Sequence, residues 1–300
     1  MRRAASGWMN GMIGVVVFSG SLPATRVAVQ GFDPVFLTVA RAAIAGILGL
    51  GLLLALGGRR PARADLPSLV LVALGVVVGF PLLTAMALRH VTSAHGVVFI
   101  GLLPLATAVF GAIRAGERPR PAFWAFALAG SGLVAAFALG QGAGGSRVGD
   151  ALMLAAILLC GLGYAEGGRL ARRLGGWQVI TWALALSLPV TGALCLLRWP
   201  RSFAEVTAAE WASLGYVSLF SMLIGFVFWY RGLAQGGIAA VGQLQLLQPF
   251  FGLALAALLL GEPVTPAMAL VCAAVIACVV GARRFAQGPA PADAAARAAG

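Results

Sequence analysis

The sequence has no lysine and few charged residues of any kind. Asp, Glu, Lys and Arg together make up 10% of its 300 residues, whereas water-soluble domains carry about 25%. So few polar side chains cannot cover a globule of this size, which excludes a water-soluble enzyme as the default class. Hydrophobic residues make up 61% of the chain, and 41 further residues are glycine. At about 20 apolar residues per membrane crossing, the chain has room for about ten transmembrane helices.

Other absences narrow the class further. The four cysteines fall inside apolar runs and none has CxxC spacing, so they predict packing residues. Two histidines and no HExxH or GxSxG motif argue against an intramembrane enzyme, and we expect no catalytic residues, no metal and no cofactor. The net charge of +12 comes from scattered short groups of arginines, which does not predict a nucleic-acid partner. A membrane scaffold is the second alternative to a transporter. A scaffold would need no polar groups in the centre of its helices.

The apolar runs predict an all-α membrane protein with ten transmembrane helices. A window of about 19 residues places them at 8–29, 34–57, 66–89, 94–113, 120–140, 149–170, 177–198, 210–233, 238–260 and 266–286. The first run is long enough to span the bilayer, so we interpret it as an uncleaved helix and not as a secretory signal. Residues 287–300 are rich in Ala, Gly and Pro and are predicted to form a disordered tail.

The arginines predict how these helices are oriented. Basic residues in short loops accumulate on the cytoplasmic side of a membrane. With the N-terminus inside, 15 of the 21 arginines fall on the cytoplasmic side and 4 outside, and Arg26 and Arg41 lie within spans. This distribution supports an even number of helices with both termini in the cytoplasm.

The two halves of the sequence match each other at an offset of 145 residues. The informative matches are Pro104 with Pro249, Gly116 with Gly261, Glu117 with Glu262, and Pro121 with Pro266. The chain therefore divides into residues 8–140 and residues 149–286, with five predicted helices in each. An odd number of helices makes the two repeats insert in opposite senses. Inverted repeats can exchange shapes around one central site, which favours a secondary transporter over a channel.

Two tandem units that each end in a proline-bearing helix, a Gly-Glu turn and a final helix resemble the EamA domain pair of the drug/metabolite transporter superfamily. The resemblance covers roughly residues 8–286. Within the superfamily, the sequence is most similar to the YddG-type amino-acid exporters of the bacterial inner membrane. It implies that helices 1, 3, 4, 6, 8 and 9 surround a central cavity, with helices 5 and 10 peripheral.

The same resemblance implies export of small neutral metabolites by alternating access. Amino acids such as threonine, methionine and the aromatic amino acids are the expected substrates, and apolar drugs or other metabolites are the alternative. Sugar-phosphate relatives are expected to hold phosphates with basic groups, so the absence of lysine disfavours a phosphorylated substrate. We expect a monomer or weak homodimer in the lipid bilayer.

Three glutamines in the ninth predicted helix are the first candidates for substrate contact. At about 100° per residue, Gln245 and Gln248 lie some 60° apart on one face, while Gln243 points away. Their counterparts at the 145-residue offset are apolar, which suggests that polar recognition comes from one repeat only. Interhelical hydrogen bonds are the alternative role for these side chains.

Further candidates come from the other helices expected around the cavity. They are Ser19 in helix 1, Phe80 and Thr84 in helix 3, His95 and Phe99 in helix 4, Tyr164 in helix 6, and Phe226 in helix 8. His95 is either a proton-coupling group or a hydrogen-bonded residue at the outer helix end. Trp229 and Tyr230 are expected to be interface anchors. Pro104 and Pro249 free backbone carbonyls and are the candidate gating points.

The charged residues within the spans are the remaining candidates. Glu166 is followed by Arg169 and Arg173, which predicts a snorkelling ion pair near the cytoplasmic end, or alternatively a coupling carboxylate. Arg41 lies some 10 Å inside helix 2 at about 1.5 Å per residue and needs a carbonyl or acidic partner. Arg26 is expected to pair with Asp33.

Overall fold

The computed structural model describes residues 2–91, 99–140, 146–260 and 266–286, and every regular element within these ranges is helical. The predicted tail, 287–300, lies outside them. Within the described ranges, six helical runs are long and apolar enough to cross a membrane: Ala5–Gly31, Pro34–Ala55, Arg63–Ala87, Arg147–Leu174, Gly176–Leu197 and Ala208–Gly236. Leu103–Ala115 and Pro121–Phe137 are shorter apolar helices. The all-α membrane class is thereby confirmed, while the count of ten spans stays a prediction.

The first half of the chain contains both continuous and interrupted helices. Its elements are α1 (Arg2–Ser19), α2 (Ser21–Gly31), α3 (Pro34–Ala55), η1 (Arg63–Asp65), α4 (Leu66–Val72), η2 (Ala73–Gly79), α5 (Phe80–Ala87), α7 (Leu103–Ala115) and α8 (Pro121–Gly140). The break between α1 and α2 is a single residue, Gly20. Asp33 caps α3, because its carboxylate accepts hydrogen bonds from the backbone N–H groups of Val35 and Phe36 at 2.9 and 3.1 Å. The Arg26–Asp33 pair stays a prediction.

The second half has the same kind of interruptions. Its elements are α9 (Arg147–Leu174), α10 (Gly176–Leu197), α11 (Ala208–Tyr216), η3 (Val217–Ile224), α12 (Gly225–Gly236), α13 (Ile238–Gly242), η4 (Gln243–Leu247), α14 (Gln248–Leu260) and α15 (Pro266–Phe285). Both η2 and η3 are π-helical, and adding 145 to residues 73–79 gives 218–224. The same rare irregularity therefore occurs at matching positions of the two sequence repeats.

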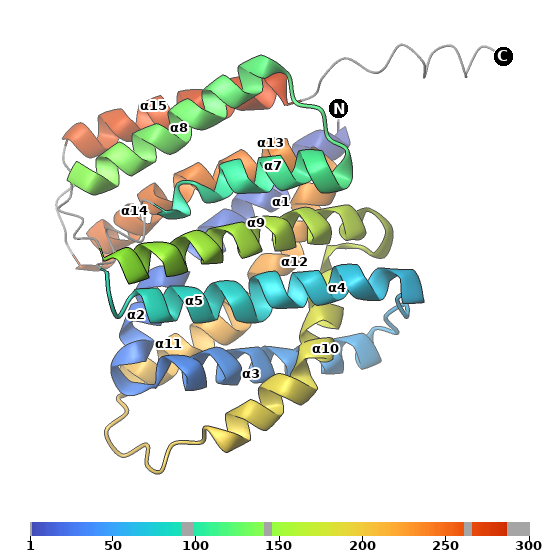
Figure 1. Cartoon of the computed structure of the whole chain (residues 1–300), viewed down its shortest axis with the longest axis vertical. Helices are drawn as coiled ribbons and strands as arrows, with labels where there is room; N and C mark the ends of the chain where they lie inside the picture. Colours follow the sequence, from blue (N-terminus) through green and yellow to red (C-terminus); the bar gives the residue numbers. More distant parts are fainter. Residues whose placement is uncertain (1, 92–98, 141–145, 261–265, 287–300) are drawn as a thin grey trace.

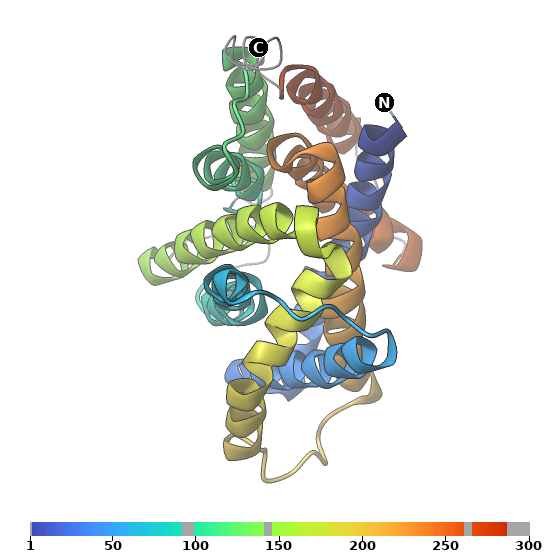
Figure 2. The ribbon, with the colours of Figure 1, turned by 90° about the vertical axis from the view of Figure 1, so that its right-hand side faces the viewer.

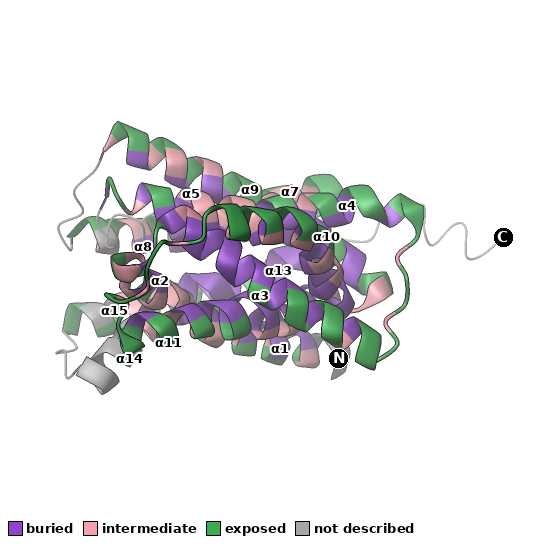
Figure 3. Cartoon of the chain, turned by 90° about the horizontal axis from the view of Figure 1, so that it is seen from below, coloured by how far each residue is buried: buried purple, intermediate pink, exposed green. Residues whose placement is uncertain are grey.

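The helices lie side by side, with α8 and α15 paired along one edge of the bundle (Figure 1, Figure 2). The rings of Phe126 and Phe285 stack in this pair with their centroids 6.0 Å apart. Buried residues concentrate between the helices and exposed residues on their outward faces (Figure 3). Many of the exposed residues are apolar, including Leu54 and Leu197, which are 77% and 80% exposed. Such outward apolar surface suits lipid and not water.

The start of α1 and the end of α15 lie at the same end of the molecule. The guanidinium carbon of Arg283, near the end of α15, lies 4.4 Å from the ring centroid of Trp8 in α1. The backbone N–H of Arg120, just before α8, donates to the carbonyl of Phe285 at 3.0 Å. We call this the arginine end of the bundle; α3 begins and α5 ends at the opposite end (Figure 1).

Glycines let two long helices approach closely. Gly7 and Gly11 of α1 face Gly232 and Gly236 of α12, four residues apart on each helix. A Cβ atom added at Gly232 would lie 2.6 Å from the backbone nitrogen of Gly11 and 3.0 Å from the carbonyl oxygen of Gly7. Small residues at four-residue spacing permit this kind of backbone contact in membranes.

The expectation that Trp229 and Tyr230 anchor the membrane interface is wrong. Both side chains have no exposed surface. The reason is that α12 packs against α1, α9 and α10 at once, so this part of the helix is enclosed by protein and does not reach the lipid headgroups.

Candidate functional site

A cavity extends from the middle of the bundle toward the end at which α3 begins. The cavity and its opening together hold about 650 Å³ that no atom occupies. It is lined by Phe18, Ser21, Thr25, Arg41, Val76, Phe80, Pro81, Thr84, Ile100, Leu103, Tyr164, Ser221, Phe226, Gln245 and Gln248. These residues belong to the runs of helices 1, 3, 4, 6, 8 and 9, the set that the family resemblance implies, with Arg41 added from α3.

The cavity lining follows the sequence repeat. Four pairs of lining residues differ by 145 in number: Val76 with Ser221, Pro81 with Phe226, Ile100 with Gln245, and Leu103 with Gln248. The two halves of the chain therefore bring equivalent positions to the same space. In three of these pairs the first repeat supplies an aliphatic side chain and the second a polar one.

Six of the residues predicted from the sequence meet in this cavity: Phe80, Thr84, Tyr164, Phe226, Gln245 and Gln248. The ring of Phe226 lies 5.9 Å from Tyr164 and 5.0 Å from Phe18, centroid to centroid. These rings form an aromatic wall, to which sequence reasoning did not assign Phe18.

Other predicted residues lie elsewhere. The Ser19 hydroxyl donates to the carbonyl of Val15 at 2.7 Å, and Phe99 packs against the main hydrophobic core; neither lines the cavity. Gln243 is fully buried, and its Nε2 donates to the carbonyl of Pro104 at 3.5 Å. His95 lies outside the described residues.

The glutamines sit on an irregular stretch of helix. Residues Gln243–Leu247 form a 3-10 helix, in which residues three apart eclipse each other, so Gln245 and Gln248 align toward the cavity. Nε2 of Gln245 donates to the Tyr164 hydroxyl at 3.2 Å, and Nε2 of Gln248 donates to the Phe18 carbonyl at 3.3 Å. Both amides are thereby held in place by other helices.

The polar side chains of the cavity lining come from both repeats, while polar recognition of the substrate by one repeat stays a prediction. The first repeat contributes Ser21, Thr25, Arg41 and Thr84 to the lining. The comparison at the 145-residue offset missed them because it considered only the counterparts of the three glutamines, and these are apolar.

Three buried polar atoms of the cavity lining have no hydrogen-bond partner among the described residues. They are Nε of Arg41, Oγ1 of Thr84 and Oε1 of Gln245. A buried polar atom without a partner is costly, so a donor or acceptor supplied by a ligand would stabilise each one. Arg41 was noted in the sequence as an intramembrane charge but not as a cavity residue; its position within a span was the available signal.

The two prolines occupy equivalent places in their helices. Pro104 is the second residue of α7 and Pro249 the second residue of α14. Proline fits the first turn of a helix, because the backbone N–H groups there make no hydrogen bond within the helix and the N–H that proline lacks is not needed. Because Gln243 of η4 donates to the carbonyl of Pro104, α7 contacts the helical segment that directly precedes α14. Their gating role stays a prediction.

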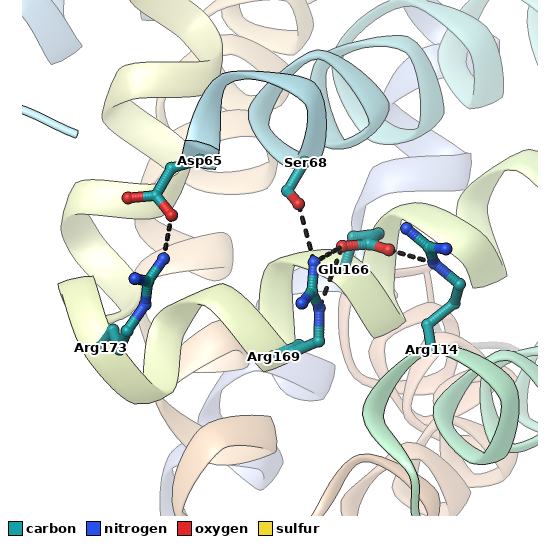
Figure 4. Close-up of polar contacts among 6 residues, drawn as sticks. All are labelled: Asp65, Ser68, Arg114, Glu166, Arg169 and Arg173. Atoms are coloured by element: carbon teal, nitrogen blue, oxygen red, sulfur yellow. Dashed lines mark hydrogen bonds and ion pairs between the residues drawn. The ribbon is translucent and has the colours of Figure 1, made fainter. Parts of the chain in front are cut away.

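An ion-pair cluster lies on the arginine-end side of the cavity (Figure 4). The carboxylate of Glu166, with no exposed surface, accepts from Nε of Arg114 on α7 and, at 2.8 Å, from Nη2 of Arg169. Nη2 of Arg169 also donates to the Ser68 hydroxyl on α4 at 2.8 Å. The cluster joins α4, α7 and α9 only two residues beyond Tyr164.

The predicted pairing of Glu166 with Arg173 is wrong in part. Arg169 pairs with Glu166 as expected, but Arg173 pairs with Asp65 at the start of α4 (Figure 4). Seven residues rise about 10 Å along a helix, so Arg173 lies too far along α9 to pair with Glu166 and meets Asp65, the residue before α4.

Glu117 of the Gly-Glu turn makes a second link at the arginine end. Its two carboxylate oxygens accept from the backbone N–H groups of Ile238 and Ala239 at 2.8 and 2.7 Å, and Arg172 donates to it at 2.6 Å. A carboxylate stabilises a helix N-terminus through free N–H groups and the helix dipole. Glu117 of the first repeat thus caps the helical run that carries the cavity glutamines of the second.

Comparison with known proteins identifies the family. The EamA-like transporter family matches the chain twice, at residues 5–138 and 147–283. The chain belongs to this family. The EamA resemblance predicted from the Gly-Glu turns is confirmed, and the protein is a multi-pass membrane transporter of the EamA kind.

Individual relatives agree with this family. The chain is 67% identical over 287 residues to the uncharacterized transporter YdeK of Bacillus subtilis (strain 168), covering 96% of this chain and 100% of YdeK. It is 28% identical over 265 residues to a probable terminal-alkyne amino-acid exporter of Streptantibioticus cattleyicolor, covering 86% of each. A solved crystal structure shares the fold with a TM-score of 0.77 at 22% identity, covering 94% of this chain and 98% of the other.

Proposed function

We propose that this EamA transporter exports small neutral metabolites, namely amino acids such as threonine, methionine and the aromatic amino acids, across the bacterial inner membrane by alternating access. In this proposal ten helices form two inverted repeats with both termini in the cytoplasm, and the arginine end is the cytoplasmic end. The transporter acts as a monomer or weak homodimer.

The observation that carries the proposal is the pairing of cavity residues across the two repeats. Four pairs at the 145-residue offset line one cavity, which supports a single site placed between two halves of related structure. Two such halves can exchange shapes and expose the site to one side of the membrane and then to the other.

The cavity chemistry supports a neutral, partly apolar substrate. Phe18, Phe80, Phe226, Ile100 and Leu103 offer an apolar surface, which suits an aliphatic or aromatic side chain. Oε1 of Gln245 and Oγ1 of Thr84 have no hydrogen-bond partner in the described part of the chain, so both can accept a hydrogen bond from an amino group. The amino-acid exporter among the relatives adds weight to this substrate class.

The two links at the arginine end support a conformation that is closed to the cytoplasm. The Glu166 cluster and the Glu117 cap join α4, α7, α9 and α13 between the cavity and that end. Export then requires these links to separate so that a cytoplasmic substrate can enter. Their separation is the proposed inner gating step.

We expect Gln245→Leu to lower transport efficiency by about 10- to 100-fold, because a hydrogen bond to a charged amino group is lost. The measurement is uptake of labelled threonine, methionine and phenylalanine into proteoliposomes. The same panel with an apolar dye tests the alternative class of apolar drugs.

Gln178→Leu is the matched control. Gln178 is another buried glutamine whose Oε1 has no hydrogen-bond partner within the described ranges, and it lies on α10 outside the cavity lining. We expect this variant to transport at the parental rate. Equal transport by both variants, with both folded, would contradict a role for Gln245 in substrate binding.

A further inference from the structure

The cavity contains a buried positive charge that the amino-group site does not use. Arg41 is 7% exposed, and among the described residues that line the cavity it is the one charged side chain. Within the described part of the chain, no ion pair joins Arg41 to a carboxylate. A guanidinium in a membrane interior is unfavourable without an anion beside it. An anionic ligand in the cavity would therefore be stabilised by Arg41.

Ser221 bonds the guanidinium directly, and Ser21 bonds Ser221 behind it. Nη2 of Arg41 donates to the Ser221 hydroxyl at 3.1 Å, and the Ser21 hydroxyl donates to Ser221 at 2.8 Å. Hydroxyls orient the guanidinium without neutralising its charge. Among the residues that the structure describes, none is hydrogen-bonded to Nε of Arg41, which leaves a donor for a planar oxyanion, and carboxylates fit the arginine fork.

The other cavity groups limit which anion fits. The remaining polar side chains of the described lining are serine, threonine, tyrosine and glutamine, all neutral. One cation matches a single negative charge, whereas a phosphate dianion would keep excess charge in an apolar space. The acceptor Oε1 of Gln245 comes from another helix, so the cavity offers separate places for a negative and a positive end of one molecule.

We propose that Arg41 is the subsite for the substrate's carboxylate, and that it makes this transporter select free amino acids over amines and amino-acid esters. The proposal rests on the proposed function and deepens it. Arg41 draws the carboxylate toward α3, Gln245 accepts from the amino group, and the substrate side chain meets the aromatic wall of Phe18 and Phe226.

The experiment measures ligand binding to the full-length protein in lipid nanodiscs by calorimetry. The four ligands share the methionine side chain. Methionine has both the carboxylate and the amine, methioninol and methionine methyl ester lack the free carboxylate, and 4-(methylthio)butanoate lacks the amine. For the parent protein we expect methionine to bind at least about tenfold more tightly than methioninol or the ester. This comparison needs no variant, so it holds even where a substitution impairs folding.

Variants then assign the selectivity to Arg41. We expect R41Q to bind methionine and methioninol with about equal affinity. R41K should keep part of the parental preference for methionine, because lysine keeps the positive charge but lacks the paired N–H donors of the guanidinium. Arg198→Gln is the matched control, since Arg198 is an exposed arginine just after α10 and outside the cavity lining. It should keep the parental preference.

The outcomes separate the two proposals. Binding of methionine and methioninol with equal affinity, unchanged in R41Q, would overturn the carboxylate subsite and leave amino-acid export standing. Arg41-dependent binding of 4-(methylthio)butanoate without any binding of methionine would overturn amino-acid export and support the subsite. Failure of every carboxylate to bind the parent protein would overturn both.

Discussion

Glu166→Gln is expected to open the cavity toward the arginine end. The Glu166 carboxylate is the shared acceptor for Arg114 and Arg169, and a neutral amide would present N–H donors to the same guanidinium groups. Both arginine side chains are 43% exposed, so water screens the pairs, and we assign them about 1–2 kcal/mol together. Their loss would shift the balance toward the inward-open conformation by about 5- to 30-fold.

Thiol labelling measures this shift. Val76 lines the cavity and is 2% exposed, so Val76→Cys, with the four native cysteines replaced by alanine, reports access to the cavity. A charged, membrane-impermeant thiol reagent is added to inside-out vesicles, where it meets the cytoplasmic face. We expect labelling at least about fivefold faster with Glu166→Gln than without it.

Glu205→Gln is the control for removing one negative charge. Glu205 is exposed and lies in the connection between α10 and α11, away from the cluster. It should leave the labelling rate unchanged. If Glu166→Gln also labels at the parental rate, while the reporter remains reactive from the other face, the cluster does not hold the cytoplasmic side closed.

Gly232→Ala is expected to destabilise the folded protein more than substitution of an exposed glycine within a helix. The added methyl group would overlap the backbone of α1, which cannot move aside as a flexible side chain can. Overpacking of this kind costs about 1–3 kcal/mol, which corresponds to a fall of about 3–10 °C in the unfolding midpoint. The midpoint is measured in detergent by loss of the monodisperse peak after heating.

Gly132→Ala is the matched substitution. Gly132 is an exposed glycine in α8, and apart from its neighbours on α8 no described residue has an atom within 4 Å of the position that its Cβ would take. Alanine favours helix over glycine by up to about 1 kcal/mol, so this variant should be unchanged or slightly more stable. Equal midpoints for the two variants would show that α1 and α12 can separate at little cost.

Much of the site could be predicted because the bilayer restricts where polar side chains occur. Gln245, Gln248 and Thr84 stood out as polar residues in apolar runs, and all three line the cavity. Aromatic candidates near them, Tyr164 and Phe226, also line it. Ser19 satisfied the same criterion but bonds its own helix backbone, since a serine hydroxyl can reach a carbonyl four residues earlier.

The sequence by itself determined the membrane class and the 145-residue repeat, because composition and spacing along one chain carry that information, and its Gly-Glu turns carried the resemblance to the EamA family. Only the tertiary structure decided which partners the charged residues take. Arg114 meets Glu166 from 52 residues away and Asp65 meets Arg173 from 108 residues away. Helical periodicity sets the direction of a side chain on its own helix. Which helix stands opposite depends on how closely backbones can pack, and the burial of Trp229 and the placement of Arg41 beside Ser221 follow from that packing.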